Sequence, residues 1–197
     1  MSAVDQLFAG LRSAGRKALI PFVTAGDPDL EFTADLLREV VRGGGHLCEL
    51  GIPYSDPIAD GPVIQASYTR ALAHRLKVGE ILEMAKRTTP DLGAPLVTMV
   101  SYAILHRYGP QRYIAECQQA GISGAIVPDL LVEEAPALAT ICRREDFSLI
   151  QLVTPTTSPE RALRIAESST GFLYYVSVTG ITGERRELPP DLLERVG

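Results

Sequence analysis

A glutamate inside an apolar segment is the first residue of this sequence that could do chemistry. Glu49 lies in the run HLCELG, whose apolar residues predict a short buried strand. Burying a carboxylate is costly unless the group is paired, binds a metal ion or has a shifted pKa. Two interpretations are open. Glu49 is satisfied by a neighbouring lysine, arginine or backbone amide, or it is a proton-transfer group.

Two further carboxylates follow in the stiff loop GIPYSDPIADGP. Asp56 and Asp60 precede a helix that is predicted to begin near Pro62. Aspartates beside proline and glycine commonly serve as turn and cap residues, which is one interpretation. In the other, an aspartate returns toward the strand end beside Glu49. Two carboxylates in different environments would then act as an acid and a base at neutral pH.

The elements that must position these groups are short apolar runs that alternate with longer segments of helical period. This alternation predicts βα units and a parallel sheet. Capping residues and prolines mark two helix starts, Asp27-Pro28 before 30–41 and Ser158-Pro159 before 160–167. The expected strands read apolar on both faces, as in a barrel wall. They are 18–24, 47–51, 96–102, 124–128, 148–153 and 172–178.

A single α/β domain over residues 1–197 is expected, because no linker or change of composition divides the sequence. Eight βα units form a (β/α)8 TIM barrel of about 250 residues, so six units correspond to a barrel truncated to about three quarters. The last expected element is a helix over 189–196, with no seventh or eighth strand after it. This predicts weak or no turnover for residues 1–197 alone.

Composition and patterning exclude several other classes of protein. Hydrophobic residues make up 46% and charged residues 22%, which predicts a globular domain. The net charge of −5 and the lack of a basic run argue against nucleic acid as a partner. No apolar run approaches the roughly 20 residues that cross a membrane. The N-terminal residues have no continuous apolar core that leads to a small-residue cleavage site, so a cytoplasmic location is expected. The cysteines and histidines lack ligand spacing, so buried thiols and no metal site are expected.

The string ELGIPYSDPIADGPVIQ resembles the signature of the tryptophan synthase alpha subunit family. Further segments resemble that family in the same order, and together they cover almost the whole chain: PFVTAGDPD, VPDLLVEEA, LVTPTTSPERALRIA and YYVSVTGITG. The resemblance implies a carbon–carbon lyase of L-tryptophan biosynthesis. Its reaction would be the retro-aldol cleavage of indole-3-glycerol phosphate to indole and glyceraldehyde 3-phosphate.

The resemblance also implies roles for individual residues. Glu49 would carry the proton at the indole C3 and at the glycerol hydroxyl, while Asp60 would accept the indole N–H and stabilise the cationic intermediate. Five substrate-binding residues would lie on the expected strands one, three, four and six: Phe22, Val100, Tyr102, Val127 and Tyr174. Tyr174 is chosen over Tyr175 because the family tyrosine stands three residues before the serine that matches Ser177.

Loops beyond the strands would complete the site. Thr182 and Gly183 lie in a segment that resembles the mobile sixth loop of the family, in which a threonine closes over the substrate. Arg185 and Arg186 follow, and either attract phosphate or are solvated surface residues. Asp129 comes after the fourth expected strand. It either contacts the mobile loops or caps a helix.

The resemblance implies a partner but no cofactor in this chain. Pyridoxal phosphate is expected only in the beta subunit, with which an α2β2 tetramer is implied. Two departures from the family predict a contact with that partner that differs in detail. The segment SYAILHRYG, expected to be a loop after the third strand, lacks an Asn-Pro pair, and Leu130 and Leu131 replace a frequent proline pair. Two other functions stay open: a regulatory binding subunit without catalysis, and another phosphate-sugar barrel enzyme such as an isomerase.

Overall fold

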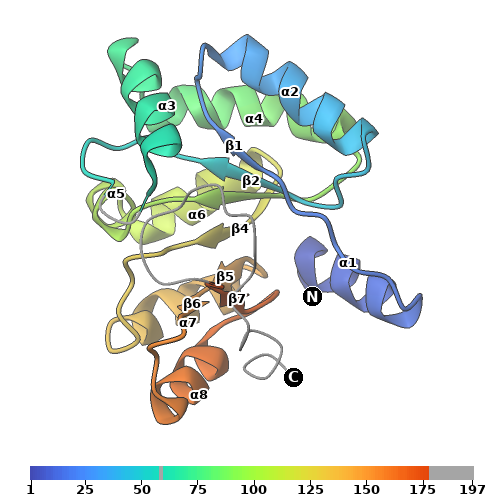
Figure 1. The fold of residues 1–197 in the computed structure, drawn as a ribbon, viewed down its shortest axis with the longest axis vertical. Coiled ribbons are helices and arrows are strands. Elements are labelled where there is room, and N and C mark those ends of the chain that lie inside the picture. The colour runs from blue at the N-terminus through green and yellow to red at the C-terminus, as the bar shows by residue number, and fades with distance from the viewer. Residues whose placement is uncertain (58–59, 178–197) are drawn as a thin grey trace.

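Strands and helices alternate along residues 1–57 and 60–177, the part of the chain that the computed structural model describes (Figure 1). The strands are β1 (Phe22–Thr24), β2 (Cys48–Gly51), β3 (Leu96–Met99), β4 (Ile122–Ile126), β5 (Ser148–Ile150), β6 (Leu152–Val153) and β7 (Tyr174–Tyr175). The helices are α1 (Ala3–Ser13), α2 (Leu30–Arg42), α3 (Pro62–Ala73), α4 (Val78–Leu92), α5 (Tyr102–Tyr108), α6 (Pro110–Gln119), α7 (Ala135–Arg144) and α8 (Pro159–Ser168).

The strands form a parallel wall in chain order. β1 to β5 pair successively, and β6 pairs with β7. The break between β5 and β6 falls at Gln151, whose N–H donates to Ser169 Oγ at 3.2 Å instead of joining the ladder. The Gln151 carbonyl still accepts from the Tyr174 N–H at 3.0 Å. The segment from β5 to β6 therefore pairs with β4 at its start and with β7 at its end, and the expected α/β barrel architecture is confirmed.

The expected strands were too long in several places. The strand expected over 96–102 ends at Met99, and Tyr102 instead begins α5, a helix in what was expected to be a loop. Val127 directly follows β4 instead of lying in it. Two helices, α3 and α4, separate β2 from β3. The helix expected over 189–196 lies outside the described residues.

The cap of the first long helix was also misplaced by two residues. Asp29 caps α2, accepting from the Phe32 N–H at 2.7 Å, while Asp27 forms an ion pair with Arg70 on α3. Ser158 caps α8 as expected. The three cysteines are buried and free. Burial raises the pKa of Cys48 to about 11, which keeps its thiol protonated. No helix within the described ranges is long and apolar enough to span a membrane.

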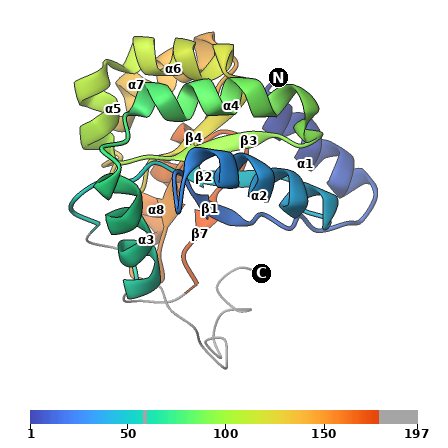
Figure 2. The same cartoon turned by 90° about the horizontal axis from the view of Figure 1, so that it is seen from above.

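Two groups of apolar residues pack on opposite faces of the wall. The helix-facing core joins strand residues such as Cys48 and Leu50 to helix residues such as Leu37 and Ile114. The interior cluster contains Val4, Leu47, Val97, Ile126 and Ile150. Helices α2, α4, α6 and α7 lie along the outside of the sheet, as Figures 1 and 2 show. Because strand side chains alternate between faces, these clusters tell which way each strand residue points.

Helix α1 lies across the amino-terminal end of the strands. Its Val4 is fully buried in the interior cluster, and Leu7 and Phe8 pack against the same residues. Ser2 and Asp5 form a capping box, and Ser2 Oγ lies 2.8 Å from Ser148 Oγ at the start of β5. This end of the wall is therefore covered by apolar side chains and a buried hydroxyl pair.

We expect Leu50→Ala to lower the free energy of unfolding by about 2–5 kcal/mol, because it removes buried methyl groups and leaves a cavity. Leu50 is 0% exposed in the helix-facing core. Urea unfolding curves measure the change. Leu163→Ala is the matched control, because Leu163 is 61% exposed. Equal losses in the two variants would contradict the assignment of Leu50 to the core.

Candidate functional site

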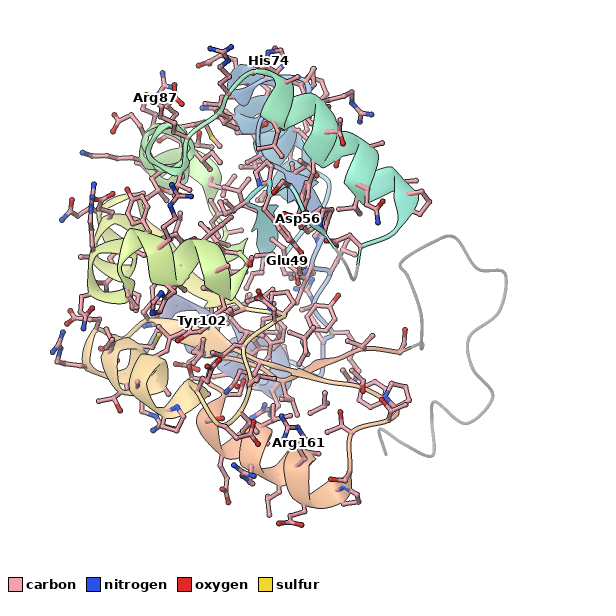
Figure 3. All side chains as sticks on the ribbon, turned by 90° about the vertical axis from the view of Figure 1, so that its left-hand side faces the viewer. Glu49, Asp56, His74, Arg87, Tyr102 and Arg161 are labelled. Atoms are coloured by element: carbon pink, nitrogen blue, oxygen red, sulfur yellow. The ribbon has the colours of Figure 1, made fainter. Side chains whose placement is uncertain are left out.

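Glu49 lies inside β2 and points to the interior of the wall. Cys48 and Leu50 belong to the helix-facing core, and Leu47 belongs to the interior cluster. Glu49 shares the face of Leu47 because side chains two positions apart on a strand point the same way. Figure 3 shows Glu49 near the middle of the molecule. The side chain is buried, at 4% exposure.

Burial raises the pKa of Glu49 to about 7. The described residues supply no lysine, arginine or backbone amide that forms an ion pair or hydrogen bond with its carboxylate. A carboxyl group in this environment exchanges its proton near neutral pH. Of the two interpretations open from the sequence, this geometry favours the proton-transfer group over the satisfied structural glutamate.

Asp60 lies beyond the carboxyl end of β2, just before α3. It borders a small hollow of about 30 Å³, which we call the Asp60 hollow; the other lining residues are Tyr54, Tyr68, Met99, Val100, Ser101 and Pro128. A cavity of this volume holds about one water molecule. Tyr54 Oη donates to Asp60 Oδ2 across 3.5 Å. Burial, the larger effect, raises the pKa of Asp60, and the bond from Tyr54 opposes it.

Two tyrosines beside Asp60 were missed by the sequence analysis. The rings of Tyr54 and Tyr68 lie 5.6 Å apart and are tilted by 53°. Burial, with the charge of Asp60 as a smaller cause, raises the pKa of both hydroxyls, that of Tyr54 to about 12. Both groups therefore stay protonated and can donate hydrogen bonds. Their positions six residues before and eight after Asp60 carry no pattern that would have indicated this.

The two carboxylates lie at the same end of the wall but do not touch. Met99 lines the Asp60 hollow and packs against the interior cluster, and it pairs with Gly51, two residues after Glu49. Along β2, Gly51 therefore lies between Glu49 and the hollow that Asp60 borders. Glu49 does not line the Asp60 hollow. That both acids border one substrate cavity stays a prediction.

Phe22 covers the strand between the two acids. It pairs with Glu49 in the parallel register of β1 and β2. A Cβ atom at Gly51 would lie 2.4 Å from Phe22 Cζ and 3.1 Å from Tyr68 Oη. Only glycine at position 51 leaves room for these two rings. The predicted binding residue Phe22 thus lies on the interior side, directly beside Glu49 and Gly51.

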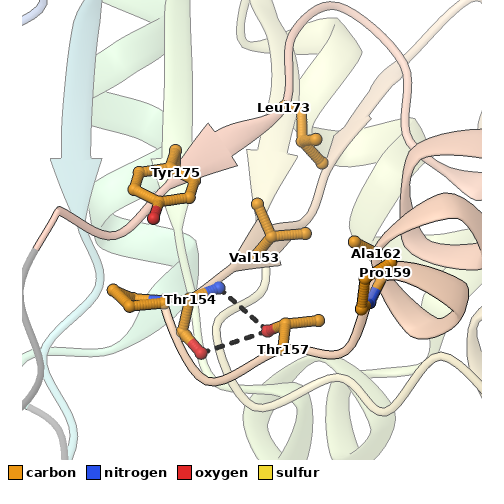
Figure 4. Close-up of a pocket in the computed structure, with 8 residues that line it drawn as sticks. Val153, Thr154, Thr157, Pro159, Ala162, Leu173 and Tyr175 are labelled. Atoms are coloured by element: carbon orange, nitrogen blue, oxygen red, sulfur yellow. Dashed lines mark hydrogen bonds between the residues drawn. The ribbon is translucent and has the colours of Figure 1, made fainter. Parts of the chain in front are cut away.

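Tyr174 and Tyr175 point to opposite faces of β7. Tyr174 packs against the interior cluster, and burial together with the nearby charge of Glu49 raises its pKa. Tyr175 packs with Val153 and Ile165 toward α8 and lines a pocket of about 530 Å³ (Figure 4). That pocket is larger than the Asp60 hollow, but it lies on the helix-facing side. The structure therefore places Tyr174, the residue chosen from the sequence, on the face of Glu49.

The remaining expected wall residues have mixed positions. Val100 lines the Asp60 hollow and is buried in the helix-facing core. Val127 is buried in the same core and lines none of the described pockets. Tyr102 is half-buried at the first position of α5, with its ring 5.9 Å from that of His106. Thr182, Gly183, Arg185 and Arg186 lie outside the described residues.

Asp129, which follows β4, forms hydrogen bonds with two residues that follow the neighbouring strand β3. Its Oδ1 accepts from the Tyr102 N–H and its Oδ2 from Ser101 Oγ, each at 2.7 Å. Of the two roles left open by the sequence, the structure shows a cap, supplied to α5 from another element. Asp129, Ser101, Asp56 and Arg107 also line a surface groove of about 440 Å³. No group of three or more metal-ligating side chains occurs within the described ranges.

Comparison with known proteins gives one consistent result. A family model described as "Tryptophan synthase alpha chain" matches residues 8–197. The tryptophan synthase alpha chain of Rhodopirellula baltica is 56% identical over 100% of this chain and 72% of its own length. That of Trichormus variabilis is 49% identical over 100% of this chain and 75% of its own length.

Solved structures agree in fold. Mycobacterium tuberculosis tryptophan synthase superposes with a TM-score of 0.90 at 32% identity, covering 99% of this chain and 76% of that one. Tryptophan synthase subunit alpha from Legionella pneumophila gives a TM-score of 0.85 at 37% identity, covering 89% of this chain and 68% of that one. These identities and the shared parallel wall carry the assignment to a family.

Proposed function

Because the chain belongs to the tryptophan synthase alpha chain family, lyases of tryptophan synthesis, we propose that it splits indole-3-glycerol phosphate. The products are indole and glyceraldehyde 3-phosphate. The bond that breaks joins the indole C3 to the first glycerol carbon. Cleavage requires a proton at C3, a stabilised positive charge at the ring nitrogen and loss of the proton from the hydroxyl of that carbon.

Glu49 is proposed to move both protons. Its protonated carboxyl donates to C3, and the resulting carboxylate then takes the hydroxyl proton as the carbon–carbon bond breaks and the aldehyde forms. One proton is gained and one lost, so Glu49 ends each cycle as it began. A general acid–base group works best when its pKa lies near the working pH. The pKa of about 7 and the interior position of Glu49 support this role.

Asp60 is proposed to accept a hydrogen bond from the indole N–H. Protonation at C3 places positive charge on the ring nitrogen, and a carboxylate beside it stabilises that charge most strongly when water is excluded. The partial burial of Asp60 in its hollow supports this proposal. Phe22 and Tyr174 would supply apolar contacts for the bicyclic ring, together with Tyr102 and with Val100, which lines the Asp60 hollow.

We also propose the cofactor and the partner that the family resemblance implies. The chain itself needs no cofactor, and it associates with a beta subunit that carries pyridoxal phosphate. The segment from Tyr102 to Tyr108, expected to be a loop, is α5, and with the exposed Leu131 it presents the surface that departs from the family pattern. An α2β2 tetramer and a cytoplasmic location stay predictions.

The observation that carries the function is one buried glutamate with a pKa near neutral on the interior face. The test is release of indole from indole-3-glycerol phosphate by the natural protein that contains this sequence. Residues 1–197 alone form a second arm, which measures the expected weak turnover. Activation of a beta subunit without indole release by the natural protein would favour the non-catalytic binding subunit instead.

Asp60→Asn is expected to slow indole release about tenfold or more, because the amide still accepts a hydrogen bond but no longer offsets the positive charge. Steady-state kinetics with indole-3-glycerol phosphate measure the change. Asp56→Asn is the matched control, since Asp56 lies in the same loop but is exposed and does not line the Asp60 hollow. Equal effects of the two substitutions would contradict the role of Asp60.

A further inference from the structure

Helix α5 is too short to define its own position. It has seven residues, Tyr102–Tyr108, and isolated helices of this length are unstable in water. The amides of its first turn have no acceptor within the helix. Ser101 Oγ accepts from the Ala103 N–H, but at 3.3 Å. Something outside the helix must therefore fix where it begins.

Asp129 supplies that contact from the neighbouring strand end. It lies three residues after β4, whereas Ser101 and Tyr102 lie two and three residues after β3. Both carboxylate oxygens are used, one by the Tyr102 N–H and one by Ser101 Oγ, at 2.7 Å each. Hydrogen bonds to a charged group are the stronger kind, and a negative charge is favourable at a helix N-terminus.

One of the two residues that Asp129 holds lines the hollow beside Asp60. Ser101 is buried and lines both the Asp60 hollow and the adjoining surface groove. Tyr102 follows Ser101, and the hydrogen bond to its amide fixes the backbone from which its side chain extends. Tyr54, the donor to Asp60, lines the same surface groove as Asp129.

We propose that Asp129 is a positioning residue for the lyase reaction: by holding Ser101 and Tyr102 it fixes the part of the substrate site that Ser101 forms beside Asp60. The inference rests on the proposed function, since it assumes that the substrate lies against this wall. Asp129 is exposed, and among the described residues its hydrogen bonds are those with Ser101 and Tyr102. It acts on the substrate through them and not by direct contact.

The experiment compares Asp129→Ala, Asp129→Asn and Asp29→Ala in the natural protein that contains this sequence. Asp29 is a matched control, because it is also an exposed aspartate that caps a helix with a 2.7 Å bond, to the Phe32 N–H, yet it lines none of the described pockets. Asparagine at 129 can still accept from the Tyr102 N–H and donate to Ser101 Oγ. Each variant is measured for thermal stability, amide hydrogen exchange in α5, and kcat and KM for indole-3-glycerol phosphate.

Asp129→Ala is expected to speed exchange at the Tyr102 and Ala103 amides and to raise KM about tenfold or more, because it removes two hydrogen bonds to a charged group, and the loss of one such bond already corresponds to about that factor. Asp129→Asn should raise KM less than Asp129→Ala does, because the amide can keep both hydrogen bonds but loses the charge, and Asp29→Ala should lose stability with an unchanged KM. If Asp129→Ala lowers stability but leaves KM unchanged, Asp129 is only a structural cap and the proposal is wrong. If the wild-type protein releases no indole, the proposed function itself fails. The exchange data then test only whether Asp129 fixes the start of α5.

Discussion

Glu49→Gln is expected to lower kcat for indole release by about 10² to 10⁴, the usual cost of removing a proton-transfer group. Glutamine preserves the size of the side chain and its place among the interior residues, but it cannot give a proton to C3 or take one from the hydroxyl. KM should change much less than kcat, because the substitution leaves the apolar contacts of the indole ring intact.

The measurement is steady-state indole release near pH 7, with Glu133→Gln as the control. Glu133 is an exposed glutamate that pairs with Arg161, far along the chain from the strand that carries Glu49. Thermal unfolding of each variant verifies that it is folded. A Glu49→Gln protein that keeps the wild-type kcat would refute the proton-transfer role. It would leave the non-catalytic binding subunit as the better interpretation.

The same residue should make stability depend on pH. The pKa of Glu49 rises from 4.5 to about 7 on folding, because burial disfavours the charged form. Below pH 4.5 the carboxyl is protonated in both states and carries no penalty. Between pH 4.5 and 7 the unfolded chain ionises first, so the folded state loses stability as the pH rises. Above pH 7 the full penalty is present, about 3 kcal/mol for a shift of this size.

Glu49→Gln removes this penalty, so the variant should unfold like wild type near pH 4.5 and be more stable than wild type by up to about 3 kcal/mol at pH 8. Urea unfolding of the two proteins at several pH values gives the difference directly, and titrations elsewhere in the chain cancel. A difference that does not change with pH would mean that Glu49 ionises normally in the folded protein. A lower kcat together with this gain in stability would identify Glu49 as a residue that lowers the stability of the fold but is required for its function.

The sequence predicted the strand that carries Glu49 almost to the residue, 47–51 against Cys48–Gly51, because a short apolar run between a glycine turn and a proline loop has few alternatives. It failed at the next strand. The apolar residues from Leu96 to Tyr102 suit either a strand or the first turn of a helix, and periodicity does not separate these over so few positions. The cap that decides between them comes from Asp129, 27 residues after Tyr102.

Some residues of the candidate site could likewise be predicted from the sequence, and others could not. Glu49 was predictable because an acid in an apolar run is conspicuous. Strand alternation shows only that Tyr174 and Tyr175 point to opposite faces, and the choice of Tyr174 came from the resemblance to the family. The surroundings of Asp60 were not predictable. Tyr54 and Tyr68 reach it from a loop and a helix, and Ser101 from another strand end, so their proximity depends on how the elements pack. Likewise, Val127 suits a core position and a ligand wall equally well by residue type.

Helix α1 has a consequence for how small molecules travel. Val4, Leu7 and Phe8 pack against the interior cluster at the amino-terminal end of the strands, so apolar side chains block that end of the described wall. A ligand that binds beside Glu49 would therefore not enter from the side of α1. We expect it to arrive from the carboxyl ends of the strands, where Asp60 lies.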